Sequence, residues 1–182
     1  MSMVVAVPKE TFPGERRVAL VPSAVADLKR ADLAVLVESG AGLAAGWRDD
    51  DFSDKGARII PSREELFRQA DVLLQVRGPG ANPVSGRDDL PHLRPGQVLI
   101  GHQEPLTETG TVQDLAERGV VTLAMELMPR ITRAQSMDSL SAMATIAGYR
   151  AVLLAATALP RIFPMLMTAA GTLAPAKVFI VG

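Results

Sequence analysis

The chain has 182 residues, and 48% of them are hydrophobic, so it carries enough apolar material for a packed core and is not a disordered segment. Its 19 basic and 20 acidic side chains give a net charge of -1, which disfavours nucleic acid as a partner. The absence of cysteine excludes disulfides, thiolate metal sites and cysteine nucleophiles, and fits a reducing compartment.

Apolar runs of strand length alternate with helix-like segments from Met3 to Met125. This alternation predicts parallel strands joined by right-handed crossovers, and therefore an open α/β sheet of the Rossmann or flavodoxin-like type. The predicted strands are Met3–Val7, Leu33–Val37, Ala57–Ile60, Asp71–Val76, Val98–Gly101 and Val120–Met125. The predicted helices are Pro22–Arg30, Asp49–Lys55, Ser62–Ala70 and Thr107–Arg118.

The longest irregular stretch runs from Arg77 to Gly96, directly after a predicted strand. Loops at the carboxyl ends of parallel strands are where open sheets bind ligands, but the composition is equally typical of a solvated loop. The three carboxylates from Asp49 to Asp51 resemble a metal cluster only superficially, because consecutive side chains point in different directions. We interpret them as a solvated helix start, and no metal site is predicted.

The N-terminal sequence MSMVVAVPKE lacks the basic start and long apolar region of a signal peptide. The most lipid-like stretch, Ala151 to Ala176, is interrupted by Arg161 and three prolines, whereas a spanning helix needs about 20 nearly continuous apolar residues. We therefore expect no direct membrane insertion, and any membrane association would arise through a partner.

The character of the sequence changes at Ser136, where small residues recur along a predicted long helix that can pack closely against a neighbour. The chain closes on PAKVFIVG, which is a proline, a β-branched apolar run and Gly182. This is the pattern of a buried parallel strand entering a nucleotide-binding turn. The predicted organisation is an α/β lobe over residues 1–135. Residues 136–182 would then form a bridging helix, a linker and the first strand of an incomplete dinucleotide-binding lobe.

Polar side chains concentrate between Met128 and Val152, where a strand ends and the long helix begins. Helix capping explains part of this pattern, because Thr132 with Gln135 forms a Thr-x-x-Gln box and Asp138 suits the positive end of a helix dipole. Ser136 is an alternative N-cap. Capping does not require the arginines that stand beside these residues.

Gln135, Asp138 and Ser141 follow one another at intervals of three, so they project from about one side of a helix. With the guanidinium of Arg130 they would bring together an amide, a carboxylate, a hydroxyl and a positive charge. Such a set can grip a polar heterocycle that carries a carboxamide. Spacing alone leaves this binding interpretation and the capping interpretation both open.

Three stretches carry a family resemblance. PRITRAQSMDSLSAMATIAGYRAV, Pro129 to Val152, resembles the characteristic segment of the NAD(H)-binding domain in the alpha subunit of proton-translocating NAD(P) transhydrogenase. VAVPKETFPGERRVALVP, Val5 to Pro22, resembles the opening shared by that subunit and alanine dehydrogenase. FPMLMTAAGTLAPAKVFIVG, Phe163 to Gly182, is similar to the family's run into its dinucleotide turn. The resemblance covers essentially the whole chain.

The resemblance implies two lobes with NAD(H) in the cleft between them, and residues of the central segment around the nicotinamide. Carried over position by position, Arg130 and Asp138 would form a pair that organises the site. Gln135 and Ser141 would meet the carboxamide or the ribose. Gly182 would open the glycine turn for the pyrophosphate. No side chain of this domain need act as an acid or a base.

The implied reaction is direct hydride transfer from NADH to NADP+, coupled to inward proton movement. NADP(H) would be bound by a partner domain, membrane subunits would complete the complex, and the intact protein would be a homodimer. The implied location is cytoplasmic, peripheral to the inner membrane through the complex. Because the second lobe would continue beyond Gly182, we expect this chain alone to be inactive.

Two other interpretations stay open. An alanine dehydrogenase-like oxidoreductase shares the opening, but Arg77 falls where that family has a carboxylate-binding lysine. Gln103 falls nearer than His102 to that family's catalytic histidine, and we interpret His102 as a loop or strand-end residue. Arg16 and Arg17 fall where an arginine of alanine dehydrogenase binds the substrate carboxylate, whereas the transhydrogenase has no such substrate. We interpret them as structural residues that tie the first loop to the sheet or to the lobe interface. The other alternative is a catalytically silent fragment that acts at most as a docking module.

Overall fold

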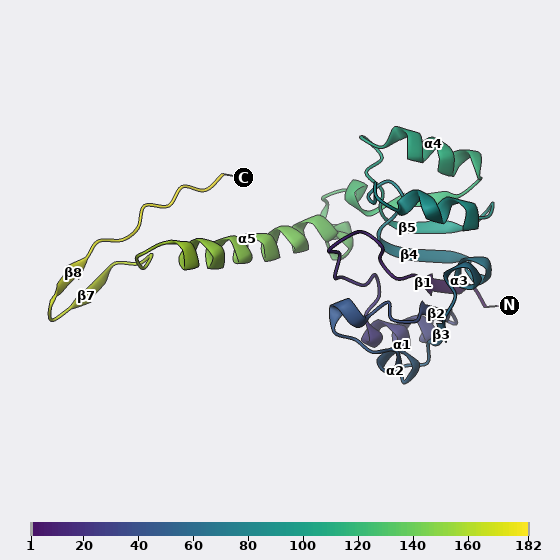
Figure 1. Ribbon diagram of the computed structural model, residues 1–182, viewed down its shortest axis with the longest axis horizontal. Coiled ribbons are helices and arrows are strands. Elements are labelled where there is room, and N and C mark those ends of the chain that lie inside the picture. The colour runs from purple at the N-terminus through teal and green to yellow at the C-terminus, as the bar shows by residue number, and fades with distance from the viewer. Residues whose placement is uncertain (1, 182) are drawn as a thin grey trace. The chain divides into compact units, whose positions relative to one another are not determined.

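The computed structural model describes residues 2–181, and the chain divides into two units, the first ending at Met137 and the second beginning at Asp138. A six-stranded parallel sheet forms the first unit, with the strand order β3-β2-β1-β4-β5-β6 (Figure 1). Each strand end lies within one residue of the sequence prediction, so the open α/β sheet is confirmed. The strands are β1 (Val4–Val7), β2 (Ala34–Glu38), β3 (Arg58–Ile60), β4 (Val72–Arg77), β5 (Val98–His102) and β6 (Val121–Ala124).

Helices connect the strands at the predicted places. Ser62 caps one of them by accepting a hydrogen bond from Glu65 N at 3.3 Å. The Asp49 carboxylate accepts from Ser39 Oγ at 2.7 Å and Gly40 N at 2.8 Å, so the aspartate run is a helix start, as predicted. The α-helices of this unit are α1 (Pro22–Arg30), α2 (Asp49–Ser53), α3 (Arg63–Gln69) and α4 (Thr109–Glu117). The 3₁₀ helices are η1 (Leu43–Ala45), η2 (Gly86–His92), η3 (Met125–Leu127) and η4 (Thr132–Met137).

The sheet is packed on both faces, which is why its strands read as nearly continuous apolar runs. Ala6 faces a cluster that α3, η2 and α4 close, and the next residue, Val7, faces a second cluster that α1 and α2 close. The covering helices contribute Leu66, Phe67, Leu90 and Leu115 to the first cluster and Val25 and Phe52 to the second.

The order of the strands reverses between β1 and β4, because β2 and β3 lie on one side of this pair and β5 and β6 on the other. In open α/β sheets ligands bind at this switch point, outside the carboxyl ends of the strands. The stretch from Arg77 to Gly96 leaves β4 at this edge, and the solvated-loop interpretation of it is wrong. It contains η2, it buries Asn82 and Asp89, and Asn82 Nδ2 donates to Thr11 Oγ1 at 2.8 Å. These contacts bind the loop after β4 to the loop after β1.

The second unit contains the long helix that the sequence predicted, α5 (Ser139–Ala158), and an antiparallel hairpin that it did not predict, β7 (Leu166–Thr168) with β8 (Gly171–Leu173). Among the described residues, α5 alone is long and apolar enough to cross a membrane, and none of that stretch is buried in the structure. Length and composition do not distinguish a spanning helix from a core helix. The expectation of no direct membrane insertion therefore stays a prediction.

The final apolar run does not form the predicted strand. Residues 177–181 have no regular secondary structure, and Phe179 and Ile180 are 90% and 80% exposed. A parallel strand is held by hydrogen bonds to its neighbours, and no strand among the described residues pairs with this segment. That residues 177–181 form the first strand of a dinucleotide-binding lobe therefore stays a prediction. Gly182, predicted to bind the cofactor, lies outside the described residues.

Candidate functional site

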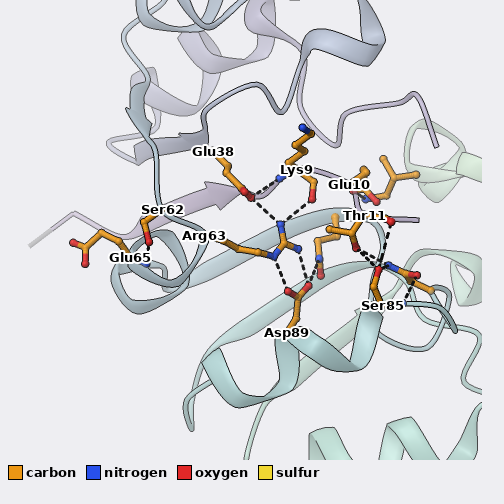
Figure 2. A network of polar contacts seen from close by, with 12 residues as sticks. Lys9, Glu10, Thr11, Glu38, Ser62, Arg63, Glu65, Ser85 and Asp89 are labelled. Atoms are coloured by element: carbon orange, nitrogen blue, oxygen red, sulfur yellow. Dashed lines mark hydrogen bonds and ion pairs between the residues drawn. The ribbon is translucent and has the colours of Figure 1, made fainter. Parts of the chain in front are cut away.

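Charged side chains gather at the carboxyl edge of the sheet, around Arg63 (Figure 2). Arg63 is the first residue of α3, and its Nε and Nη2 donate to the two carboxylate oxygens of Asp89 in η2 at 2.7 and 2.8 Å. Its Nη1 donates to Glu38 Oε2 at the end of β2, at 2.7 Å, and to Lys9 O after β1, at 2.9 Å. One guanidinium thus joins four segments of the chain.

The Arg63 network is largely removed from water. The exposed fractions of the Arg63, Glu38 and Asp89 side chains are 21%, 13% and 5%. Burial alone would lower the pKa of the Arg63 guanidinium, but the hydrogen bonds and charges of Asp89 and Glu38 outweigh burial and raise that pKa. Gln75 Nε2 adds a hydrogen bond to Asp89 Oδ2 at 3.1 Å. The paired charges hold this edge of the sheet in one geometry.

Glu10, in the loop after β1, binds the end of β4. Its carboxylate accepts from Val76 N at 2.6 Å and from Arg77 N at 3.1 Å. The β1–β4 ladder ends before these residues, so the carboxylate satisfies two backbone amides that the neighbouring strand does not reach. Burial raises the pKa of the Glu10 carboxyl, and the two amide hydrogen bonds offset the rise only in part.

Glu15 is surrounded by five hydrogen-bond donors. Its Oε1 accepts from the backbone N of Arg16 and of Arg17, at 3.1 and 3.0 Å, and from Arg17 Nε at 2.8 Å. Its Oε2 accepts from Arg17 Nη2 at 2.6 Å and from Arg77 Nε at 3.0 Å. The Glu15 side chain is only 6% exposed. Arg77 therefore ties the first loop to the end of β4 through Glu15, and Arg17 holds the Glu15 carboxylate in place within that loop, in agreement with the structural interpretation of Arg17.

The hydrogen bonds of Glu15 predict a dependence of stability on pH. Hydrogen bonds from Arg17, against the opposing effect of burial, lower the pKa of Glu15 from 4.5 to about 2. Its contribution to the free energy of unfolding is therefore complete above pH 4.5 and is lost as pH falls to about 2. We expect urea unfolding to show wild type more stable than Glu15→Gln near neutral pH, with the difference shrinking over that interval. Glu117→Gln, at an exposed position of α4, is the matched control for the substitution itself. A constant difference for Glu15→Gln across the interval would contradict the prediction.

The loop after β4 lies directly on the end of β5. A Cβ on Gly80 would lie 1.9 Å from Gln103 O, so this position needs glycine, and a Cβ on Gly78 would lie 2.2 Å from Gln103 Nε2 and would displace that side chain. The Gln103 side chain is buried beneath this loop. His102 is the last residue of β5, with Nδ1 3.7 Å from Glu126 Oε2. This position agrees with the interpretation of His102 as a strand-end residue.

Arg130 and Gln135, two of the four predicted nicotinamide residues, belong to the first unit. Gln135 lies in η4, which the buried Ala134 anchors, and Arg130 lies just before it. Both side chains are exposed, and within residues 2–181 neither takes part in a hydrogen bond or an ion pair. Their polar groups are therefore available to a ligand.

Asp138 and Ser141, the other two, belong to the second unit and contact each other. Asp138 is the N-cap of α5, with Oδ1 accepting from Leu140 N at 3.1 Å and Ser141 N at 3.0 Å. Ser141 Oγ donates to Asp138 Oδ2 at 2.6 Å. The capping interpretation is thus confirmed for Asp138, and the alternative prediction, that Ser136 is the N-cap, is wrong. The pairing of Arg130 with Asp138 stays a prediction.

The sequence analysis missed the charged network at the switch point. A signal was available, because a charged residue ends or closely follows three of the apolar strands, at Glu10, Glu38 and Arg77. Arg63 gave no such signal, since it reads as an ordinary surface residue in the first turn of α3. The hydrogen-bond partners of Arg63 can be identified only from the structure, because they come from distant segments of the chain.

Residues 6–147 match the family model described as the alanine dehydrogenase/PNT, N-terminal domain. The chain belongs to this family. Within it, the chain is 44% identical over 180 residues to a Rhodospirillum rubrum protein that is named as the first part of the NAD(P) transhydrogenase alpha subunit. This match covers 99% of the chain and 47% of the Rhodospirillum rubrum protein.

Two further relatives allow the sequence identity to transhydrogenases to be compared with the identity to alanine dehydrogenases. The crystal structure of transhydrogenase from Sinorhizobium meliloti matches with a TM-score of 0.82 and 42% identity, over 95% of this chain and 50% of that one. The alanine dehydrogenase of Halomonas elongata is 32% identical over 184 residues, covering 99% of this chain and 47% of that protein. The chain spans about half the length of the relatives it matches, and the identity is higher to the transhydrogenases.

Proposed function

We propose that this chain is the first lobe, with the start of the connection to a second lobe, of the NAD(H)-binding component of proton-translocating NAD(P) transhydrogenase. The observation that carries the proposal is the 44% identity of nearly the whole chain to a transhydrogenase alpha subunit, against 32% to an alanine dehydrogenase. The reaction would be hydride transfer from NADH to NADP+, coupled to proton translocation.

The polar groups of the central segment suit a nicotinamide carboxamide. The Arg130 guanidinium can only donate, the Gln135 amide can both donate and accept, and both are exposed and available. The Asp138 carboxylate fixes the Ser141 hydroxyl in one orientation, with lone pairs left to accept a hydrogen bond. NAD(H), when bound, supplies the hydride. These four side chains would orient the ring, and none of them needs to exchange a proton with it.

The remaining features of the proposal concern the complex. NADP(H) would be held by a partner domain, membrane subunits would carry the proton, and the intact component would be a homodimer. The name of the Rhodospirillum rubrum relative, which describes a subunit divided between polypeptides, supports a multi-subunit assembly. The chain would then lie on the cytoplasmic side, peripheral to the inner membrane.

An alanine dehydrogenase-like activity has less support. Arg77, at the position of that family's carboxylate-binding lysine, donates Nε to Glu15 at 3.0 Å and Nη1 to Ala81 O at 3.2 Å, so two of its nitrogens are already engaged. Gln103, at the position nearest to that family's catalytic histidine, is buried, and a carboxamide cannot act as a general acid or base at physiological pH.

A chimera tests the proposed function. Residues 1–182 would replace the matching 180 residues of the Rhodospirillum rubrum subunit, expressed with the other subunits of that enzyme, and hydride transfer between NADH and NADP+ would be followed in membrane vesicles. We expect the chimera to support the reaction. A folded chimera that instead reduces NAD+ with alanine would favour the alanine dehydrogenase interpretation. A folded chimera with neither reaction would favour a silent docking module and overturn the proposal.

A further inference from the structure

The Gln103 carboxamide is buried and has no partner in the described part of the chain. The residue is only 2% exposed, and within residues 2–181 neither Nε2 nor Oε1 makes a hydrogen bond. Gln97, just before β5, shows the usual arrangement of a buried carboxamide. Its Nε2 donates to Phe67 O at 2.7 Å and to Ala70 O at 2.8 Å, and its Oε1 accepts from Arg94 N at 2.8 Å. Because burial without a partner costs a polar group its hydration, the Gln103 carboxamide indicates a partner that is not a protein group.

A second unpaired atom lies on the neighbouring strand. Gln75 is 6% exposed, and its Nε2 donates to Asp89, but within residues 2–181 its Oε1 has no hydrogen-bond partner. Leu73 and Leu99 pair in the β4–β5 ladder and belong to the same apolar cluster. Gln75 and Gln103 follow them by two and four residues, so both side chains project from this face of the sheet. Two carboxamides at the carboxyl ends of adjacent strands thus leave three polar atoms unpaired on one face.

The two carboxamides are close enough to share a small ligand. Gly101 precedes Gln103 by two residues and lies directly against β4, since a Cβ on Gly101 would collide with the Gln75 carbonyl oxygen. Two residues correspond to about 7 Å along a strand. Two long side chains and two hydrogen bonds of about 2.8 Å each can span such a separation through one small molecule.

The chemistry of the unpaired atoms selects water as that molecule. The atoms are two acceptor oxygens and one NH₂ donor, and water both donates and accepts. All three atoms are neutral, so they suit an uncharged ligand better than an ion. Gly78, in the loop after β4, packs directly on the Gln103 carboxamide, and the enclosure favours a ligand of minimal size. Buried water molecules typically make about three hydrogen bonds to groups that the protein leaves unpaired.

We propose that at least one buried water molecule is bound between Gln75 and Gln103, beneath residues 78–80. This water acts as a structural ligand that links the carboxyl ends of β4 and β5. It also supports, from below, the loop that leaves β4 at the switch point of the sheet. The inference does not rest on the proposed function.

The sign of the effect of Gln103→Met tests the proposal. Methionine has nearly the length and volume of glutamine but no carboxamide. With water bound, the variant loses hydrogen bonds and leaves Gln75 Oε1 or the water short of a partner. The folding equilibrium constant from urea unfolding of the whole chain should therefore fall about tenfold. If no water is bound, methionine removes an unpaired polar group, and the chain should become more stable. An unchanged or increased folding constant would overturn the proposal.

Gln97→Met is the matched control. Gln97 is also fully buried, and its substitution removes three hydrogen bonds that the structure contains, so its folding constant should fall whether or not water binds at Gln103. A decrease for Gln97→Met establishes that the measurement detects the loss of a satisfied carboxamide.

A crystal structure of the wild-type 182-residue chain gives a readout that does not depend on the folding of a variant. We expect electron density for an ordered water within about 3.2 Å of both Gln75 Oε1 and the Gln103 carboxamide. Well-ordered carboxamides without such density between them would overturn the proposal.

Discussion

Replacing Arg63 by methionine is expected to lower the free energy of unfolding by about 3–5 kcal/mol. Methionine approximates the length of the arginine stem but brings no charge and no donor. Asp89, with a side chain only 5% exposed, would keep a single hydrogen bond from Gln75, and Glu38 would lose its ion pair. Leaving buried carboxylates uncompensated costs more than an exposed ion pair contributes, which is why this substitution should have one of the largest effects in the chain.

Urea unfolding of Arg63→Met measures this effect, with Arg68→Met as the matched control. Arg68 lies on the same helix, and its ion pair with Glu65 is exposed, so its loss should change the free energy of unfolding very little. The double variant Arg63→Met with Asp89→Asn should recover part of the loss, because it removes the buried negative charge. A loss in Arg63→Met no larger than in Arg68→Met would show that the network does not hold the sheet edge.

The second large effect is expected in hydride transfer. In the chimera with the Rhodospirillum rubrum subunit, replacing Arg130 or Asp138 by alanine should slow hydride transfer about a hundredfold, because small misplacements of the reacting carbons can cost that much. Melting temperatures should change far less for Arg130, whose side chain is exposed and makes no hydrogen bond or ion pair within residues 2–181.

Asp138→Asn separates the two roles of Asp138. Asparagine also caps helices, so this variant should keep α5 and the melting temperature while removing the negative charge. Asp138→Ala should lose the cap as well, at a cost of about 0.5–2 kcal/mol. We expect slow hydride transfer in both variants. If Asp138→Asn transfers hydride at the wild-type rate and Asp138→Ala only melts earlier, Asp138 is a cap and has no role in orienting the nicotinamide.

The sheet could be predicted from sequence because its signals are local. Each strand of this kind is buried on both faces and reads as a short apolar run, and the crossovers between strands fix their parallel pairing. Ser62 and Glu65 likewise predict the start of α3 from a stretch of only four residues. Because all residues of such a pattern are close together in the sequence, the pattern can be recognised without the structure.

The features that the sequence missed or left open have the opposite cause. Residues 177–181 have the composition of a strand, but a strand forms only where a neighbour accepts its hydrogen bonds, and no strand among the described residues does so. The Arg63 network and the five donors around Glu15 depend on Asp89 and Arg77, which are distant in the sequence from the residues they bind. For the nicotinamide residues, spacing left capping and binding both open. The structure adds the cap at Asp138, and the hydride-transfer experiment above tests binding.

The sequence separation between Arg63 and its hydrogen-bond partners also bears on the order of folding. Its partners lie 54 residues away at Lys9, 25 at Glu38 and 26 at Asp89, so none of its bonds can form during the growth of a single helix or hairpin. The entropic cost of closing these loops has to be met first, by the apolar contacts of the sheet. The guanidinium should therefore engage after the transition state, and its loss should speed unfolding more than it slows folding. The Arg63 hydrogen bonds are thus expected to stabilise this edge of the finished sheet without guiding its assembly.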